Sequence, residues 1–171
     1  MKDYATLTHT FGPLYDKKSR VLILGSFPSV KSREQGFFYG HPQNRFWKVA
    51  AALTGSQVPS TIPEKQALLH SHHIALYDTI YQCDIIGSSD STIKNVTPSD
   101  LRDILDESPI TQIFCNGAAS HKLFSRYQEK TLSRSAILLP STSPANAAFS
   151  LEKLIAAWEP VRLALKESAG D

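Results

Sequence analysis

The sequence predicts an α/β fold in which buried parallel strands are covered by helices. Two observations lead to it. Apolar runs at residues 21–24, 74–77, 110–115 and 136–139 are each followed by a turn signal and then by a helical pattern. The chain has 171 residues, 42% of them hydrophobic, which suffices for one sizeable core and is short for two ordinary domains. We therefore expect a single domain over residues 1–171.

The predicted elements follow from local patterns. The four apolar runs are expected strands, because uninterrupted hydrophobic runs are typical of parallel strands buried on both faces. Ser99 and Ser150 are expected helix N-caps, and Pro160 is expected to kink or split the last helix. The polar segment 82–98 is expected to be a long surface loop. Periodicity predicts helices over residues 44–53, 63–70, 99–107, 118–127 and 151–165.

Charge and targeting signals restrict the class of protein. The net charge is only +2, so any role with nucleic acid must depend on locally placed cations. Cys83 and Cys115 form no CxxC or CxxH pair, and we expect both to be reduced core residues. The N-terminus has no signal-peptide pattern, and no apolar run approaches the ~20 residues of a membrane span, so the expected location is the cytoplasm, without a membrane partner.

No metal site is expected. His70, His72 and His73 cluster at the end of a predicted helix, but they have no acidic or Cys partner at ligand spacing. We interpret them as cations that complement the helix dipole when protonated. The motifs GxxxxGK[ST], GxGxxG and HExxH do not occur, which disfavours nucleoside triphosphate, dinucleotide and zinc-protease sites.

Polar clusters follow each predicted strand. In open parallel sheets, ligands bind beyond the carboxyl ends of the strands, so these clusters are where a site is expected. If the strands are parallel, the clusters converge on one rim. They are Gly25-Ser26-Phe27-Pro28-Ser29, Asp78-Thr79, Asn116-Gly117 and the segment from Pro140 to Asn146.

Residues 36–47, with the sequence GFFYGHPQNRFW, suggest a pocket for a planar base. Tyr39 is the expected stacking platform, and Gly40 permits close approach. Asn44 is suited to bind a water through its amide oxygen, and His41 to exchange a proton near neutral pH. The plainer interpretations stay open: the aromatic residues as a hydrophobic plug, Asn44 as a helix cap and His41 as an exposed turn residue.

Two loops are expected to complete the pocket and meet DNA. In the 25–29 loop, backbone N–H groups and the hydroxyls of Ser26 and Ser29 suit a base carbonyl or a water, although a simple turn explains the same residues. Lys31 follows closely and is a candidate phosphate contact. The second loop has small residues that let backbone N–H groups approach phosphates, although it also suits a plain connector. Its members are Ser141, Thr142, Ser143, Pro144, Ala145 and Asn146.

Together these motifs resemble the uracil-DNA glycosylase superfamily, and in particular its hypoxanthine-DNA (deoxyinosine) glycosylase branch. They occur in the family's order from about residue 20 to 165, and they include the loop Gly87-Ser88-Ser89-Asp90-Ser91. The stretches 36–49 and 150–154 are also similar to mismatch-specific uracil/thymine glycosylases. The resemblance implies a three-layer α/β/α sandwich with a four-stranded parallel sheet.

The resemblance also implies an activity. The expected enzyme hydrolyses the N-glycosidic bond of a deaminated base, hypoxanthine or uracil, that is flipped out of DNA, and so initiates base excision repair. It implies no metal and no cofactor. The expected partner is DNA with a deaminated or mismatched base, to which the chain binds as a monomer, associated with the nucleoid through this substrate.

Specific roles are carried over by the resemblance. It implies that Asn44 and Asn116 are the catalytic residues, with Asn44 positioning the attacking water. Tyr39 stacks on the flipped base, Asp78 and Asn116 read its edge, and the backbone N–H groups of Ser26 and Phe27 contact a carbonyl. Ser26 and Phe27 stand where many relatives carry a catalytic Asp or Asn, so strong uracil-specific catalysis is not implied.

Three other functions stay open on the sequence. One is a mismatch-specific uracil/thymine-DNA glycosylase, although Phe27 and Ser141 are not the amides that this branch carries. Another is a damaged-DNA-binding module that has lost its chemistry. The third is a small-molecule-binding α/β protein, which predicts no salt-dependent affinity for DNA.

Overall fold

The four predicted strands form one parallel sheet. The computed structural model describes residues 3–169, and in it the sheet has the order β3-β2-β6-β7, with every neighbouring pair parallel. The predicted α/β class with a four-stranded parallel sheet is confirmed. The strands are β2 (Val21–Gly25), β3 (Ile74–Asp78), β6 (Gln112–Asn116) and β7 (Ala136–Leu139).

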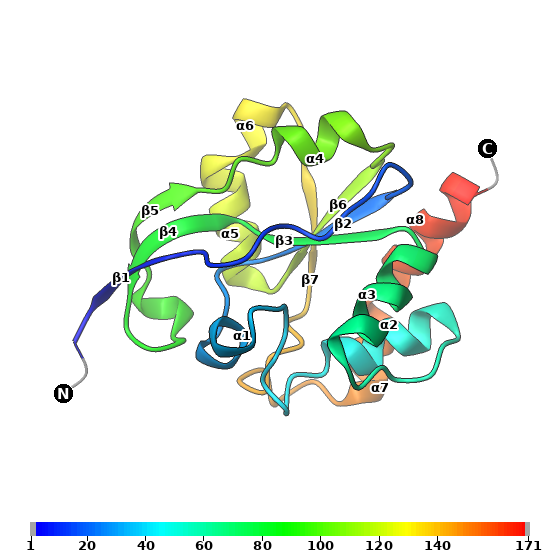
Figure 1. Cartoon of the computed structure of the whole chain (residues 1–171), viewed down its shortest axis with the longest axis horizontal. Coiled ribbons are helices and arrows are strands. Elements are labelled where there is room, and N and C mark those ends of the chain that lie inside the picture. Colours follow the sequence, from blue (N-terminus) through cyan, green and yellow to red (C-terminus); the bar gives the residue numbers. More distant parts are fainter. Residues whose placement is uncertain (1–2, 170–171) are drawn as a thin grey trace.

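Helices cover both faces of this sheet and complete the three layers. Figure 1 shows α4, α5 and α6 on one side and α2, α3, α7 and α8 on the other, with α1 below the strand ends. The helices are α1 (Val30–Gln35), α2 (Phe46–Thr54), α3 (Ile62–Ser71), α4 (Arg102–Glu107), α5 (Ala118–Tyr127), α6 (Glu129–Leu132), α7 (Leu151–Ala157) and α8 (Glu159–Ala169).

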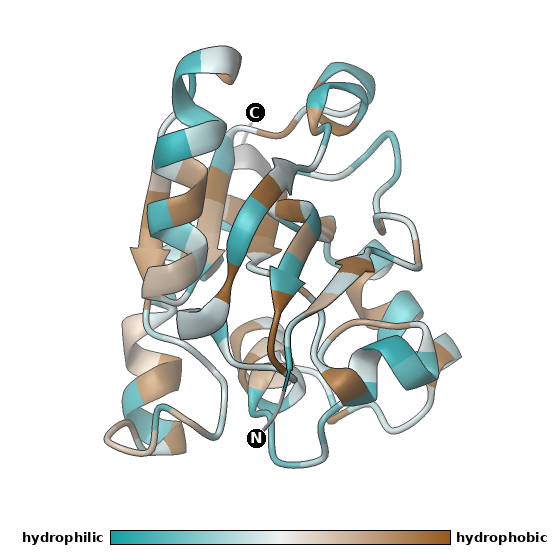
Figure 2. Ribbon diagram, turned by 90° about the vertical axis from the view of Figure 1, so that its left-hand side faces the viewer, coloured by the Kyte–Doolittle hydropathy of each residue, from teal (hydrophilic) through white to brown (hydrophobic). Residues whose placement is uncertain are grey.

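The core lies on both faces of the central strands. All five residues of β2 and of β3 are buried, and Figure 2 shows brown, hydrophobic segments along strands in the interior. Phe46, Phe114, Phe124 and Trp158 are the largest side chains with almost no exposed surface. Both cysteines are free and buried, as expected.

The segment 82–98 is not the long loop that the sequence suggests. It contains most of β4 (Ile80–Ile85), the 3₁₀ helix η1 (Asp90–Thr92) and β5 (Lys94–Pro98). Together with β1 (Ala5–Thr8), these strands form an antiparallel sheet of order β1-β4-β5. The prediction failed because β5 buries no residue and so shows no hydrophobic period, while β1 lies far away in the sequence.

Helix ends follow the predictions in part. Ser150 caps α7 by accepting a hydrogen bond from the Lys153 N–H, and the predicted last helix is split between Ala157 and Glu159, next to Pro160. The predicted Ser99 cap is wrong, because α4 begins at Arg102. Ser99 is buried instead, where its N–H donates to Thr79 and its carbonyl accepts from Gln128.

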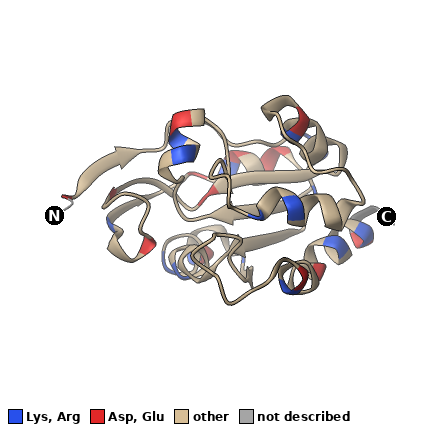
Figure 3. Ribbon diagram, turned by 90° about the horizontal axis from the view of Figure 1, so that it is seen from below, with Lys and Arg blue, Asp and Glu red and all other residues tan. Residues whose placement is uncertain are grey.

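The charged residues are spread over the surface. In Figure 3, acidic and basic residues are interspersed and do not gather into one basic face, in keeping with the small net charge. Within residues 3–169, no helix is both long and apolar enough to cross a membrane.

Candidate functional site

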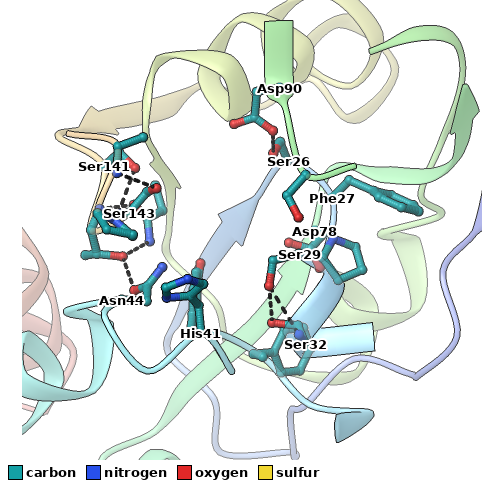
Figure 4. A pocket seen from close by; sticks show the side chains of 18 residues that line it. Ser26, Phe27, Ser29, Ser32, His41, Asn44, Asp78, Asp90, Ser141 and Ser143 are labelled. Carbon is teal, nitrogen blue, oxygen red and sulfur yellow. Dashed lines mark hydrogen bonds between the residues drawn. The ribbon is translucent and has the colours of Figure 1, made fainter. Parts of the chain in front are cut away.

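A pocket of about 300 Å³ opens at the carboxyl ends of the parallel strands. Both predicted loops and the predicted base-binding segment contribute to its wall (Figure 4). Gly40, Lys31 and Asn146 lie outside its lining. The residues predicted for the site that do line it are Ser26, Phe27, Ser29, Tyr39, His41, Asn44, Asp78, Asn116, Ser141, Thr142, Ser143, Pro144 and Ala145.

The first loop is fixed by the start of the second sheet. The carbonyls of Gly25 and Ser26 accept hydrogen bonds from the N–H groups of Thr79 and Ile80. Phe27 is 8% exposed, and its side chain belongs to a second, smaller hydrophobic cluster with Ile80, Cys83 and Ile85. The side chain points away from Asn44 (Figure 4). At Phe27, where the resemblance implies an acid or amide in many relatives, the side chain is used for packing.

A carboxyl group that the sequence predictions did not assign enters the pocket next to Ser26. The Ser26 hydroxyl donates to Asp90 Oδ1 at 2.7 Å, and Figure 4 shows this pair on the opposite wall from Asn44. Asp90 as a residue is exposed, but its carboxyl is surrounded by protein atoms. This loss of solvation raises the pKa of the carboxyl, while the hydrogen bond from Ser26 lowers it. The only signal for Asp90 was its place in the Gly87–Ser91 loop that resembles the family.

The aromatic segment shapes the floor of the pocket. The Tyr39 backbone has the left-handed φ of 51°, and its ring stacks on Phe46 with centroids 4.2 Å apart. Its hydroxyl is buried without a hydrogen-bond partner, and burial, followed by the Asp78 charge, raises its pKa. A Cβ on Gly40 would lie 3.3 Å from the backbone carbonyl oxygen of Lys31, so Gly40 lets this segment pack closely against α1.

Several predicted polar residues have local structural partners. Ser29 caps α1 by accepting from the Ser32 N–H. His41 is half-buried and accepts from the Gln43 N–H through Nδ1. Lys31 is exposed and lies 3.5 Å from Glu34.

Asn44, Thr142 and Asn116 form a chain of hydrogen bonds. Asn116 Nδ2 donates to Thr142 Oγ1 at 3.0 Å, and Thr142 Oγ1 donates to Asn44 Oδ1 at 2.8 Å. Asn44 Oδ1 also accepts from the Phe46 N–H, and Asn116 Oδ1 accepts from the Thr142 N–H. Both oxygens are thus engaged, while Asn44 Nδ2 keeps its hydrogens for a ligand. Thr142 has no exposed surface, so its side chain is unavailable to DNA.

Arg45 holds the second loop in place. Its guanidinium donates to the carbonyls of Ser143 and Asn146, both at 3.0 Å, and to that of Phe149. Its backbone N–H donates to the carbonyl of Thr142. Asn146 Nδ2 closes the loop by donating to the Ser141 carbonyl. The loop therefore has a fixed shape before any ligand arrives.

Asp78 is paired with a residue that gave no signal in the sequence. His9 Nε2 lies 2.7 Å from Asp78 Oδ2, and the His9 side chain is fully buried. His9 belongs to no recognisable sequence motif, and the pairing of β1 with β4 is what brings it next to Asp78.

No metal-binding cluster of three or more His, Cys, Asp or Glu side chains occurs in the described part of the chain. The three histidines of α3 and its end do not act together. His70 pairs with Asp16, and His72 with the Ser56 hydroxyl.

Most of the chain matches the model of a known protein family. The model described as "Uracil DNA glycosylase superfamily" matches residues 13–162, which include both loops and all four parallel strands. The chain belongs to the uracil-DNA glycosylase superfamily. The predicted enzyme class, a DNA glycosylase that acts on DNA, is thereby confirmed.

Individual members of the superfamily are similar over most of the chain. A hypoxanthine DNA glycosylase from Methanosarcina acetivorans is 30% identical over 158 residues, or 88% of this chain and 95% of the relative. One from Methanosarcina barkeri is 29% identical over 112 residues, or 64% and 71%. The solution NMR structure of a candidate uracil DNA glycosylase from M. acetivorans superposes with a TM-score of 0.77 at 28% identity, covering 91% of this chain and 96% of that one.

Proposed function

We propose that this uracil-DNA glycosylase superfamily member hydrolyses the N-glycosidic bond of hypoxanthine in DNA, with uracil as a second base. The observation that carries the proposal is the pair of free groups in one pocket, Asn44 Nδ2 as donor and Asp78 as acceptor. Hypoxanthine offers a carbonyl and a ring N–H to such a pair. The names of the two Methanosarcina relatives support the same base.

The geometry changes the role proposed for Asn44. A group that activates water needs a free acceptor, but both lone pairs of Asn44 Oδ1 are engaged. We assign to its Nδ2 the donation of a hydrogen bond to the departing base, whose developing negative charge such a fixed donor stabilises. Asp90 is the proposed acceptor of the proton from the attacking water. Asn116 acts through Thr142, by holding Asn44.

The remaining predicted residues keep supporting roles. Tyr39 has one ring face on Phe46, and the other is the proposed platform for the flipped base. The backbone N–H groups of Ser26 and Phe27 are proposed to contact a base carbonyl. The DNA backbone is proposed to bind, to one copy of the chain, along Ser29, Lys31 and the loop that Arg45 holds.

The test is single-turnover cleavage of labelled duplexes that carry hypoxanthine, uracil or a G·T mispair, followed by alkali to reveal abasic sites. Hypoxanthine release by the wild type, reduced on the order of 100-fold or more in Asn44→Ala, is the expected result. Preferential cleavage at G·T would favour a mismatch-specific enzyme. Binding without any cleavage would overturn the catalytic proposal.

A further inference from the structure

His9 and Asp78 form a buried pair beneath the pocket. The exposed fractions of their side chains are 0% and 7%. The backbone of His9 is fixed as well, because its N–H donates to the Tyr81 carbonyl at 2.6 Å, one residue beyond the β1–β4 ladder. The imidazole is packed among aromatic rings, with Phe11 and Tyr77 nearest at centroid distances of 4.6 and 4.7 Å. The ring therefore has one orientation.

The hydrogen bonds of the ring define its tautomer. The Phe11 N–H points to His9 Nδ1 at 3.5 Å, a long hydrogen bond that favours the tautomer in which Nδ1 carries no hydrogen. A neutral imidazole carries one hydrogen, which must then be on Nε2. Nε2 is the atom that lies 2.7 Å from Asp78 Oδ2. In this tautomer His9 is the donor in the pair and Asp78 Oδ2 is the acceptor.

The other carboxylate oxygen remains free for a ligand. Oδ1 lies against Gly25, where a Cβ would come within 2.4 Å of it and 3.4 Å of the Tyr39 hydroxyl. Within residues 3–169, no hydrogen bond to Oδ1 is formed, and Asp78 lines the pocket. Gly25 is needed here because any side chain would displace this oxygen. The pocket therefore presents an acceptor that cannot donate.

An acceptor of this kind distinguishes a deaminated purine from its parent. Deamination converts the 6-amino group of adenine into a carbonyl and places a hydrogen on N1, which was an acceptor. A carboxylate oxygen attracts this N–H and repels the N1 lone pair of adenine.

We propose that His9 is a positioning residue that holds Asp78 as an acceptor-only carboxylate, and that the pair selects bases in which a ring N–H adjoins a carbonyl. This inference rests on the proposed function and adds to it the chemical basis of base selection. Guanine and thymine also carry such an N–H, so this pair separates hypoxanthine from adenine and uracil from cytosine, but it does not reject guanine or thymine.

The test compares hypoxanthine with 1-deazahypoxanthine, in which C–H replaces the ring N–H, in one duplex sequence under single turnover. His9→Phe keeps a ring but removes the donor. It is expected to slow hypoxanthine release on the order of 10- to 100-fold and release of the deaza base less than about twofold. His9→Gln restores an N–H donor and is expected to recover part of the rate. His70→Gln, at the exposed His70–Asp16 pair, is the matched control and leaves both rates unchanged.

Equal slowing of both bases by His9→Phe would show a merely structural role and overturn the inference. If His9 acts only through Asp78, adding His9→Phe to Asp78→Asn should slow the reaction little further. A double variant much slower than Asp78→Asn alone would therefore also overturn the inference.

A second measurement does not depend on activity. Nitrogen-15 chemical shifts of the His9 ring at pH 7 are expected to show hydrogen on Nε2 alone; hydrogen on Nδ1 would overturn the inference. If the wild type releases no hypoxanthine, the proposed function and the base selection fall together, whereas these shifts still decide the role of His9.

Discussion

Asn44 and Asn116 are the same residue type in the same pocket, but they differ in which atoms remain free. Asn116 uses both its oxygen and its amide nitrogen on Thr142. Asn44 uses only its oxygen, on Thr142 and Phe46. Side-chain type alone made both equal candidates for catalysis. The hydrogen bonds therefore distinguish Asn44, whose amide nitrogen is free for a ligand, from Asn116, which orients Asn44 through Thr142.

Thr142→Val is expected to break this chain while keeping the shape of the side chain. It leaves Asn116 Nδ2 without its acceptor and Asn44 Oδ1 with one donor fewer, at a cost of ~1–3 kcal/mol in the free energy of unfolding. The single-turnover rate on hypoxanthine is expected to fall about 10-fold or more, because Asn44 is free to rotate. Urea unfolding and the cleavage assay measure the two effects. Thr131→Val, on exposed α6, should change neither; an unchanged cleavage rate in Thr142→Val would refute the role.

Asp90 is expected to make the reaction dependent on pH. Its proposed role requires the carboxylate, and crowding by the protein raises its pKa. The rate should therefore fall with decreasing pH as Asp90 is protonated. This acidic limb of the pH–rate profile should lie at a higher pH than the ordinary titration range of an Asp. Asp90→Asn keeps an acceptor for Ser26, removes the limb and lowers the rate on the order of 10²-fold. Asp84→Asn on β4 is the control, and persistence of the limb in Asp90→Asn would exclude Asp90 as its source.

At the scale of elements, the sequence was informative where an element buries a continuous face. The strands of the parallel sheet and α5 are found where their apolar patterns place them. β1, β4 and β5 were missed because the β1–β4 pairing joins segments as far apart in the sequence as Ala5 and Ile85, and because β5 buries none of its residues. Helix α1 was missed because Val30 is its one apolar residue, so its sequence shows no apolar period.

The second loop illustrates how an element at the site is held by its neighbour. Arg45, the residue preceding α2, fixes the loop through three carbonyls. Arg45→Lys keeps the charge, but an ammonium lacks the planar fork that reaches all three. We expect DNA affinity, measured by fluorescence anisotropy, to fall about 5- to 10-fold, because ordering the loop then opposes binding. Arg126→Lys on α5 should bind as the wild type does; equal affinity in Arg45→Lys would show that the loop is rigid without this clamp.

At the scale of the whole molecule, the site lies where the two sheets meet. β4 follows β3 after Thr79 alone, and this junction carries Asp78 at the end of one sheet and brings His9 from the edge of the other. The sequence predicted the first half of the site, since parallel strands share a carboxyl edge. It did not predict His9, because no local pattern indicates which strand pairs across the second sheet.

Chemical labelling of the two cysteines can show whether the two sheets unfold together. Cys115 lies in the main core, and Cys83 in the smaller cluster with Phe27, Ile80 and Ile85. Both thiols are buried, and burial raises the pKa of each to about 11, so we expect them to react slowly at pH 8 in the folded state. An exposed thiol, with a pKa near its ordinary value of about 8.5, reacts much faster. Labelling with iodoacetamide in low urea, followed by mass spectrometry, is expected to modify Cys83 faster, because its cluster buries less apolar surface and opens at lower free energy. Equal labelling rates at every urea concentration would instead show one cooperative unit, in which the antiparallel sheet, and with it His9, never leaves the pocket without global unfolding.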